Sequence, residues 1–296
     1  SIDDIKKIFR KKLSKSLHLD EIKTAEAVIK IANTKMAGAI RMVSISLGVD
    51  PRDFTLFAFG GAGPLHASSL AKELGIPKVL VPARPGITNA LGCVVADLRQ
   101  DFTKTLNTPI DKVNILDLHS LFEEQEKKGV ELIKKQGLKL TSISSNFSLD
   151  MQFIGQTHIL RIELPNSNPD LDYLQKSFEK SYLNRFKVKL SEIKANIVNV
   201  NTTIQGHKAL FDISLLNNKL DRRLDLDDAL LEYRNVYFKD KFLNTPIYSR
   251  DRMPFEFEMK GPAIIEQMDT TILIEPNDKV YGDYLGNMFI EVGDFS

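Results

Sequence analysis

The residues Gly60-Gly61-Ala62-Gly63 constrain the fold of this chain more than any other stretch of its sequence. They follow a short apolar run, residues 54–59, which has the length and composition of a strand buried on both faces. They precede Pro64, and proline is favoured at the first position of a helix. The pattern therefore predicts a buried strand, a glycine turn and a helix in direct succession.

A glycine turn at this place has two possible uses. Glycine lets the backbone bend sharply and lets a ligand approach where a Cβ atom would block it. The N–H groups at the start of a helix attract negative charge or the polar edge of a ligand. The turn is therefore either a nucleotide site or a tight connection, and the residues alone leave both open. Rossmann and P-loop sites are excluded, because neither G-x-G-x-x-G nor G-x-x-x-x-G-K-[ST] occurs in the sequence.

The flanking segments extend this pattern into an α/β unit. Asp20 and Gly48 bracket apolar residues at helical spacing, which predicts one long helix whose wide apolar face is buried against something sizeable. After Gly75, which ends the helix of the glycine turn, a strand is predicted over residues 78–81 and a further helix over residues 85–98. Strands that alternate with helices are typical of a parallel sheet.

The character of the sequence changes near residue 105. Residues 116–135 predict an exposed, charge-rich helix, residues 170–187 predict a second helix, and residues 216–230 predict a polar linker. The remaining segments are strand-like and turn-rich: residues 143–153, 158–164, 195–204 and 264–292. We therefore expect two domains, an α/β domain over residues 1–108 and a β-rich domain over residues 109–296.

Composition excludes several classes of function. The 40 basic and 39 acidic residues nearly cancel, so no footprint for nucleic acid or an anionic membrane is expected. No apolar run approaches the roughly 20 residues that cross a bilayer, so we expect a cytoplasmic protein. Cys93 is the single cysteine, and the five histidines lack metal-ligand spacing, so no metal site is expected. The chain begins at Ser1 and is treated as a possible fragment of a longer product.

Several unusual motifs occur in order and close together: Asp50-Pro51-Arg52-Asp53, Phe59-Gly60-Gly61-Ala62-Gly63-Pro64-Leu65-His66-Ala67, Leu74-Gly75-Ile76-Pro77, Pro85-Gly86, Ala90-Leu91-Gly92 and Asp97-Leu98. They resemble the signature of the hydantoinase A/5-oxoprolinase family, whose core is similar to the actin-like (ribonuclease H-like) ATPases. The resemblance continues through residues 151–160, 245–250 and 261–271 and covers nearly the whole chain from Asp20. It implies a partial actin-like ATPase subdomain followed by a mixed, β-rich carboxyl-terminal domain.

The resemblance also implies a ligand. Gly60, Gly61, Ala62 and Gly63 would lie along the adenosine of ATP, with Pro64 starting the helix beneath it. The acidic Asp-x-Gly-Thr loops that hold Mg²⁺ and phosphate in such ATPases are absent from this sequence. The chain would therefore hold at most half of an ATP site. The implied partners are an amino-terminal ATPase segment or subunit and a hydantoinase B-type subunit, and this chain alone should not turn over.

In the second half, Gln156 and His158 are the candidate pair facing a substrate, a small cyclic amide. Two departures from the family pattern, Gln152 and Ile159, weaken the transfer of substrate-binding roles to this strand. His66 is interpreted as a packing or hydrogen-bonding residue. The polar cluster Glu266, Asp269, Thr270 and Thr271 is interpreted as structural. No catalytic residue is assigned, because G-x-S-x-G and H-E-x-x-H are also absent.

Three functions remain open from the sequence. The first is a component of an ATP-dependent hydrolase of cyclic amides such as hydantoins or 5-oxoproline, in which ATP phosphorylates the amide carbonyl. The second is a subunit similar to that of the related acetone carboxylases, which phosphorylate a different carbonyl. The third is a non-catalytic binding or assembly module.

Overall fold

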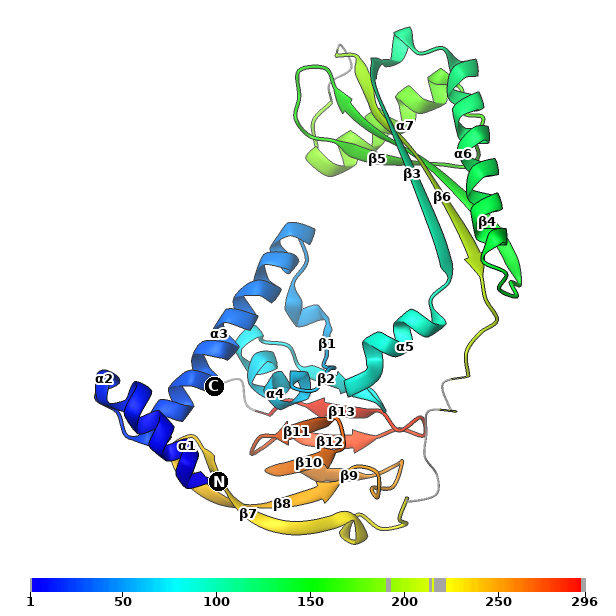
Figure 1. Ribbon diagram of the computed structural model, residues 1–296. Helices are drawn as coiled ribbons and strands as arrows, with labels where there is room; N and C mark the ends of the chain where they lie inside the picture. Colours follow the sequence, from blue (N-terminus) through cyan, green and yellow to red (C-terminus); the bar gives the residue numbers. More distant parts are fainter. Residues whose placement is uncertain (1, 190–192, 213–214, 216–221, 294–296) are drawn as a thin grey trace. The chain divides into compact units, whose positions relative to one another are not determined.

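The computed structural model describes residues 2–189, 193–212, 215 and 222–293 (Figure 1). The chain forms two compact units. The first combines Ser1–Cys93 with Asp212–Ser296, and the second is Val94–Phe211. Each unit is described by itself below.

The first unit begins with helices. They are α1 (Ile2–Phe9), a short π-helical segment (Arg10–Ser14), α2 (Lys15–Leu17) and the long α3 (Glu21–Leu47). The side chain of Asp20 accepts a hydrogen bond from the Lys23 N–H at 2.7 Å, and Gly48 ends α3 in the left-handed conformation at φ +68°. Both predicted ends of this helix are therefore confirmed.

A mixed five-stranded sheet carries the glycine turn. Its strand order is β1-β2-β13-β12-β9. The strands are β1 (Thr55–Phe57), β2 (Lys78–Val81), β9 (Glu258–Lys260), β12 (Lys279–Gly282) and β13 (Met288–Glu291). Only β1 and β2 pair in parallel, since β13 joins β2 in antiparallel register and the remaining pairs are antiparallel. The helix α4 (Gly63–Leu74) connects β1 to β2.

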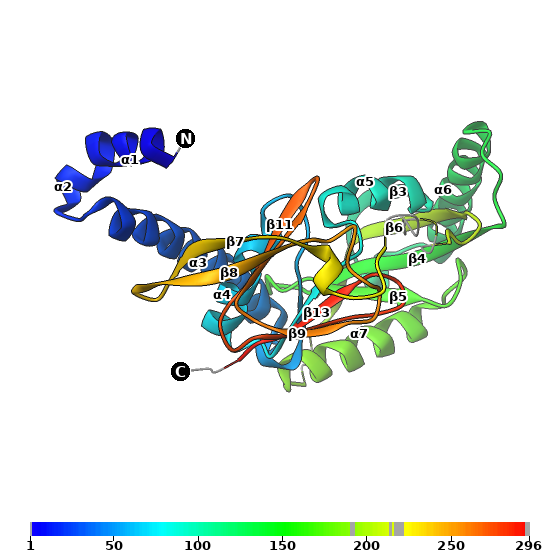
Figure 2. The ribbon, with the colours of Figure 1, turned by 90° about the horizontal axis from the view of Figure 1, so that it is seen from below.

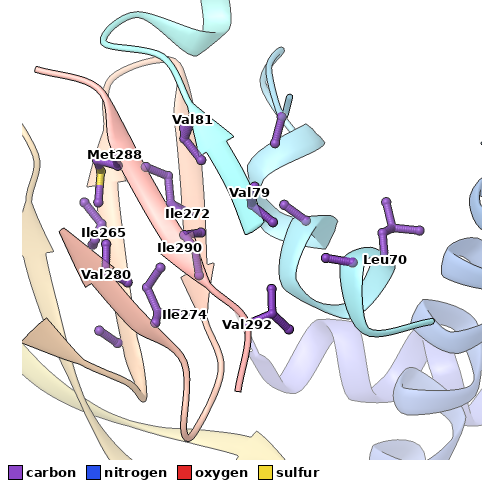
Figure 3. Packing of buried hydrophobic residues seen from close by; sticks show 14 of the residues in the cluster. Leu70, Val79, Val81, Ile265, Ile272, Ile274, Val280, Met288, Ile290 and Val292 are labelled. Carbon is purple, nitrogen blue, oxygen red and sulfur yellow. The ribbon is translucent and has the colours of Figure 1, made fainter. Parts of the chain in front are cut away.

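A second sheet of the same unit has the order β11-β10-β8-β7. It consists of β7 (Leu230–Phe238), β8 (Lys241–Ser249), β10 (Ala263–Gln267) and β11 (Thr270–Ile274). Val79 of β2, Ile290 of β13 and Ile265 of β10 are fully buried in one cluster (Figure 3). Strands from both ends of the sequence therefore share a single hydrophobic core with α4.

The second unit is a four-stranded antiparallel sheet with two helices (Figures 1 and 2). The strand order is β3-β6-β4-β5, and the elements are β3 (Leu98–Pro109), α6 (Ile115–Lys135), β4 (Ser142–Phe153), β5 (Leu160–Leu164), α7 (Leu171–Phe186) and β6 (Ala195–His207). Phe122 of α6 meets Phe147 edge-on at 5.2 Å, and Phe178 of α7 lies 4.7 Å from Phe153, measured between ring centroids. Both helices thus pack on aromatic side chains of β4.

The predicted mixed α/β class is confirmed, but the chain is divided in space differently from the predicted boundary between residues 108 and 109. Residues 212–296 belong to the first unit, because Met288 pairs with Val81 and extends the sheet of the glycine turn. A pairing across about 200 residues leaves no local trace in the sequence, so the terminal strands resembled part of a separate β-rich domain.

Several elements also differ from expectation in burial. The strand over residues 54–59 covers only Thr55–Phe57, and it is an edge strand rather than one buried on both faces. The apolar face of α3 is largely exposed, with Val43 59% and Leu47 63% exposed, where burial was expected. Conversely, the charge-rich helix α6 buries one face, including Phe122. Apolar spacing predicts a helix correctly, yet it cannot say whether this chain itself supplies the covering surface.

Other differences concern element limits. The helix expected over residues 85–98 consists of a 3₁₀ turn (Pro85–Ile87) and α5 (Thr88–Val95), and Leu98 already begins β3, which was not predicted. The hairpin of β7 and β8 was also missed. Within the expected linker over residues 216–230, residues 216–221 lie outside the described residues, and Leu230 begins β7. Among the described helices, none is both long and apolar enough to cross a membrane.

Candidate functional site

The glycine turn leaves β1 with an open side. Gly60 has φ +83°, a conformation that glycine adopts freely and other residues rarely do. A Cβ atom placed on Gly60 would meet no atom within 4 Å. The backbone is held from one side, because the Gly60 N–H donates to the carbonyl oxygen of Pro85 at 2.7 Å. The turn is therefore a fixed stretch of main chain with free space beside it.

The hairpin between β10 and β11 packs against the glycine turn. The Thr270 hydroxyl contacts the carbonyl oxygens of Gly60 at 3.3 Å and Gly61 at 3.1 Å, so it donates to this pair of acceptors. A Cβ atom on Gly86 would fall 2.2 Å from the carboxylate oxygen Oδ2 of Asp269. Asp269 thus packs against Gly86, and Thr270 packs against the glycine turn. Both residues were interpreted from sequence as structural.

The helix that follows the turn is anchored to α3. Pro64 is buried in the first turn of α4, and Ala62 precedes the helix. The Nδ1 atom of His66 lies 2.8 Å from Oδ1 of Asn33, which is buried on α3. The expected hydrogen-bonding role of His66 is confirmed by this contact.

An apolar hollow of about 310 Å³ adjoins the same region. Its walls come from α3, β1 and α4, and they include Met36, Ile40, Phe57, Phe59 and Gly63. Of the four residues of the glycine turn, Gly63 is the one that lines it. These walls suit apolar atoms, so the hollow offers an apolar surface next to the glycine turn.

Arg250, a buried arginine, holds the segment next to Pro85, whose carbonyl oxygen accepts the hydrogen bond from the Gly60 N–H. The guanidinium of Arg250 donates to the carbonyl oxygens of Pro82 at 2.7 Å and Gly286 at 3.1 Å, and its residue is 1% exposed. Burial lowers the pKa of Arg250 to about 9, and the nearby cations Arg222 and Arg84 act in the same direction. Arg84 itself pairs with Asp251 at 3.1 Å. The sequence assigned no role to Arg250, because its partners are main-chain atoms of distant segments.

The predicted substrate-facing pair lies in the second unit. Gln156 and His158 are exposed in the loop between β4 and β5, so His158 stands before the strand rather than in it. The His158 ring lies 4.9 Å from the ring of Phe186 at the end of α7. A hollow of about 250 Å³ beside this end of α7 is lined by Phe153, Tyr182, Lys180 and other residues. The glycine turn belongs to the first unit, and the role of the pair in substrate binding stays a prediction.

Metal ligation is a separate question from nucleotide binding. Within the part of the chain that the structure describes, no three His, Cys, Asp or Glu residues are grouped so as to hold a metal ion. A Mg²⁺ ion that accompanies a nucleotide would therefore need ligands from the nucleotide, from water or from another part of the protein.

Comparisons with known proteins cover nearly the whole chain. A family model described as hydantoinase/oxoprolinase matches residues 1–102, and one for the hydantoinase/oxoprolinase C-terminal domain matches residues 110–288. An uncharacterized protein of Methanocaldococcus jannaschii is 33% identical over 267 residues, which cover 90% of this chain and 38% of that protein. The caprolactamase subunit alpha of Pseudomonas jessenii is 28% identical, over 92% of this chain and 40% of the subunit.

Two solved structures share the fold. The ATP-dependent caprolactamase from Pseudomonas jessenii matches with a TM-score of 0.73 and 26% identity, over 97% of this chain and 42% of that chain. A nucleotide-free acetone carboxylase matches with a TM-score of 0.74 at 22% identity, over 96% and 42% of the two chains. This chain thus spans about two fifths of the length of these relatives. The matched models and the motifs of the glycine turn agree, and the chain belongs to the hydantoinase/oxoprolinase family.

Proposed function

We propose that this chain is part of an ATP-dependent hydrolase of cyclic amides and that its glycine turn forms the adenosine side of the nucleotide site. The observation that carries the proposal is the open turn at Gly60, which has a positive φ and no atom within 4 Å of a Cβ position. The relatives named caprolactamase and 5-oxoprolinase support the cyclic amide as substrate class. Because ATP is the proposed cofactor, we place the protein in the cytoplasm.

The residues of the turn fit a nucleoside. Gly60, Gly61 and Ala62 present main chain without bulky side chains, so a flat base and ribose can approach closely. The first turn of α4 offers main-chain N–H groups to polar atoms of the ligand. ATP would supply the phosphoryl group that turns the amide oxygen into a leaving group, and Mg²⁺ would accompany it. This chain would hold and orient the nucleoside.

The uncovered surfaces next to the turn support an amino-terminal ATPase segment as the partner. Within the described residues, β1 pairs on one edge only, with β2. Phe54, just before β1, and Phe57, at its end, are about half exposed. Met42 and Ile45 of α3 are more exposed still. An uncovered edge strand with apolar neighbours is a template for another chain segment. Relatives that are more than twice as long have further sequence to cover it.

Subunit partners are a further part of the proposal. One relative is a subunit alpha, and another is the acetone carboxylase beta subunit of Xanthobacter autotrophicus, 24% identical over 93% of this chain and 39% of that subunit. We expect a second subunit of the hydantoinase B type to act with the complete protein on the small cyclic amide.

Calorimetric titration with ATP tests the half-site. We expect no saturable heat with this chain alone and micromolar binding once the amino-terminal segment of the same gene product is added. Circular dichroism controls for folding in both samples. Failure of the folded, assembled protein to bind ATP would overturn the proposal.

Acetone carboxylation is the second candidate, favoured by the relative named acetone carboxylase beta subunit. ATP consumption by the assembled protein separates the two activities. Consumption that depends on a lactam or hydantoin supports the cyclic amide hydrolase, whereas consumption that depends on acetone and bicarbonate supports the alternative. If the protein binds ATP but does not consume it with either substrate class, the non-catalytic binding or assembly module remains as its function.

A further inference from the structure

Three side chains far apart in the sequence meet at one end of the sheet of the second unit. Asp97 directly precedes β3, Ser144 lies on β4, and His207 is the last residue of β6. The Ser144 Oγ atom lies 2.8 Å from Nε2 of His207, and Nδ1 of the same ring lies 2.7 Å from Oδ2 of Asp97. A hydroxyl, an imidazole and a carboxylate are therefore joined in one line of hydrogen bonds.

The hydrogen bonds determine where the protons lie. The backbone N–H of Lys208 and then the His207 ring hold the pKa of the Asp97 carboxyl below its usual value, so this carboxylate is ionised near neutral pH and only accepts hydrogen bonds. Nδ1 of His207 must then carry the proton. In the neutral ring, Nε2 is left as an acceptor, and the Ser144 hydroxyl donates to it. This is the arrangement of a nucleophile, a general base and a carboxylate that orients the base.

The three side chains lie on the face of the sheet that the helices leave open. A Cβ atom on Gly206 would fall 2.8 Å from a methyl carbon of Ile133, so Gly206 faces α6. Side chains alternate along a strand, and the neighbouring residues Gln205 and His207 therefore face away from α6. The side chains of His207 and Asp97 are 34% and 37% exposed. A small reagent in solution can reach the group.

Donors for a developing oxyanion lie nearby. Gln205 stands directly opposite Ser144 in the β4–β6 register, and its Oε1 accepts a hydrogen bond from Asn146 at 3.2 Å, which orients its NH₂ group. Among the described residues, β5 pairs with β4 only from Phe147 to Met151. The stretch of β4 around Ser144 therefore keeps one edge on which main-chain N–H groups are not used by a strand.

We propose that Ser144, His207 and Asp97 form a second reactive site, which cleaves small activated acyl esters through a covalent acyl-serine. Oγ of Ser144 attacks the carbonyl carbon while its proton passes to Nε2 of His207. The ester C–O bond breaks, and the leaving alkoxide takes that proton. Water then attacks the acyl-serine by the same route and releases the carboxylic acid. The open surface suits short acyl groups, and the site is independent of the proposed nucleotide function.

Two reagents test the site on the folded chain. A fluorophosphonate probe should form a bond from phosphorus to Oγ of Ser144 with release of fluoride, and peptide mass spectrometry should locate it there. p-Nitrophenyl acetate should be hydrolysed with turnover. The matched control is Ser142→Ala, because Ser142 lies two residues away on the same face and opposite His207 in the register.

The variants have distinct expectations. Ser144→Ala should abolish labelling, and His207→Gln should lower its rate by about 10²-fold or more. Asp97 is a positioning residue, so Asp97→Asn should lower the rate by up to about 10⁴-fold with little change in KM, and Asp97→Glu should restore part of it. Ser142→Ala should label like the parent chain, and unfolding midpoints should show that all variants fold. Labelling elsewhere, or equal rates for Ser142→Ala and His207→Gln, would show that the three residues only tie the strands together and would overturn the proposal.

Discussion

The glycine turn of the first unit and the β4–β5 loop of the second unit are the two places where the sequence suggested ligand contacts, and they are built differently. The turn is held by Pro85, by Thr270 and by the segment that Arg250 anchors. In the loop, the Ile154 N–H donates to the carbonyl oxygen of Lys194 and the Gln156 N–H to that of Phe153, while His158 packs on Phe186. The side chains of Gln156 and His158 are exposed. A site made of braced main chain is preorganised for a ligand, whereas exposed side chains on a loop must be ordered when the ligand binds.

The largest expected effect is on the bracing of the turn. Arg250→Met removes the donor to the carbonyl oxygens of Pro82 and Gly286 and leaves these buried acceptors unpaired. We expect a loss of about 2–4 kcal/mol in the free energy of unfolding, since each unpaired buried group costs about 1–3 kcal/mol. Urea denaturation measures it. As a control, Arg99→Met removes an exposed ion pair with Asp101 in the second unit and should cost below about 1 kcal/mol. Equal losses would show that Arg250 has no special role.

The next effect concerns the open side of the turn. Gly60→Val puts a β-branched residue at φ +83° and a side chain into the space proposed for the nucleoside. We expect ATP affinity of the assembled protein to fall by about 10²-fold, measured by calorimetry. Gly137→Val is the matched control, because Gly137 has φ +67° and an equally open Cβ position outside the turn. Equal ATP affinity for the two variants would place the nucleoside elsewhere.

A third change tests the contact between Gly86 and Asp269, which lies in the hairpin between β10 and β11. Gly86→Ala forces a Cβ atom to within 2.2 Å of the Asp269 carboxylate, so the hairpin must shift. We expect a loss of about 1–3 kcal/mol in stability from overpacking. The double variant Gly86→Ala with Asp269→Gly should recover part of it in urea denaturation. No recovery would mean that the strain arises from another neighbour.

The smallest effect is expected in the loop of the second unit. His158→Ala removes a ring that packs on Phe186, and we expect a loss of about 0.5 kcal/mol in stability and no change in ATP affinity. If the pair faces the cyclic amide, KM for that substrate should rise several-fold in the assembled enzyme. Leu210→Ala, a fully exposed position in the same unit, is the control for surface truncation. An unchanged KM would show that His158 is not part of the substrate site. It would also increase the difference between this loop and the glycine turn as candidate ligand sites.

Sequence reasoning located the candidate turn but not its supports. Glycine, proline and capping residues act on their own backbone within a few residues, so Gly60, Pro64 and Gly75 could be interpreted directly. Thr270 and Arg250 act on atoms about 170–210 residues away, and neither a threonine in a strand nor an arginine just after one carries a sign of such a partner. The same holds for Asp97, Ser144 and His207, which no short motif connects.

The sequence by itself determined both ends of α3, the end of α4 and the start of α7, because Asp20, Gly48, Gly75 and Asp170 satisfy or terminate local hydrogen bonds. It also determined the sharp turn after β1, because a positive φ at Gly60 costs glycine little. Only the tertiary structure decided that β13 lies beside β2 and that α3 keeps much of its apolar face uncovered. Strand partners and covering surfaces depend on which distant segments bury one another, and alternating apolar residues satisfy many such pairings equally well.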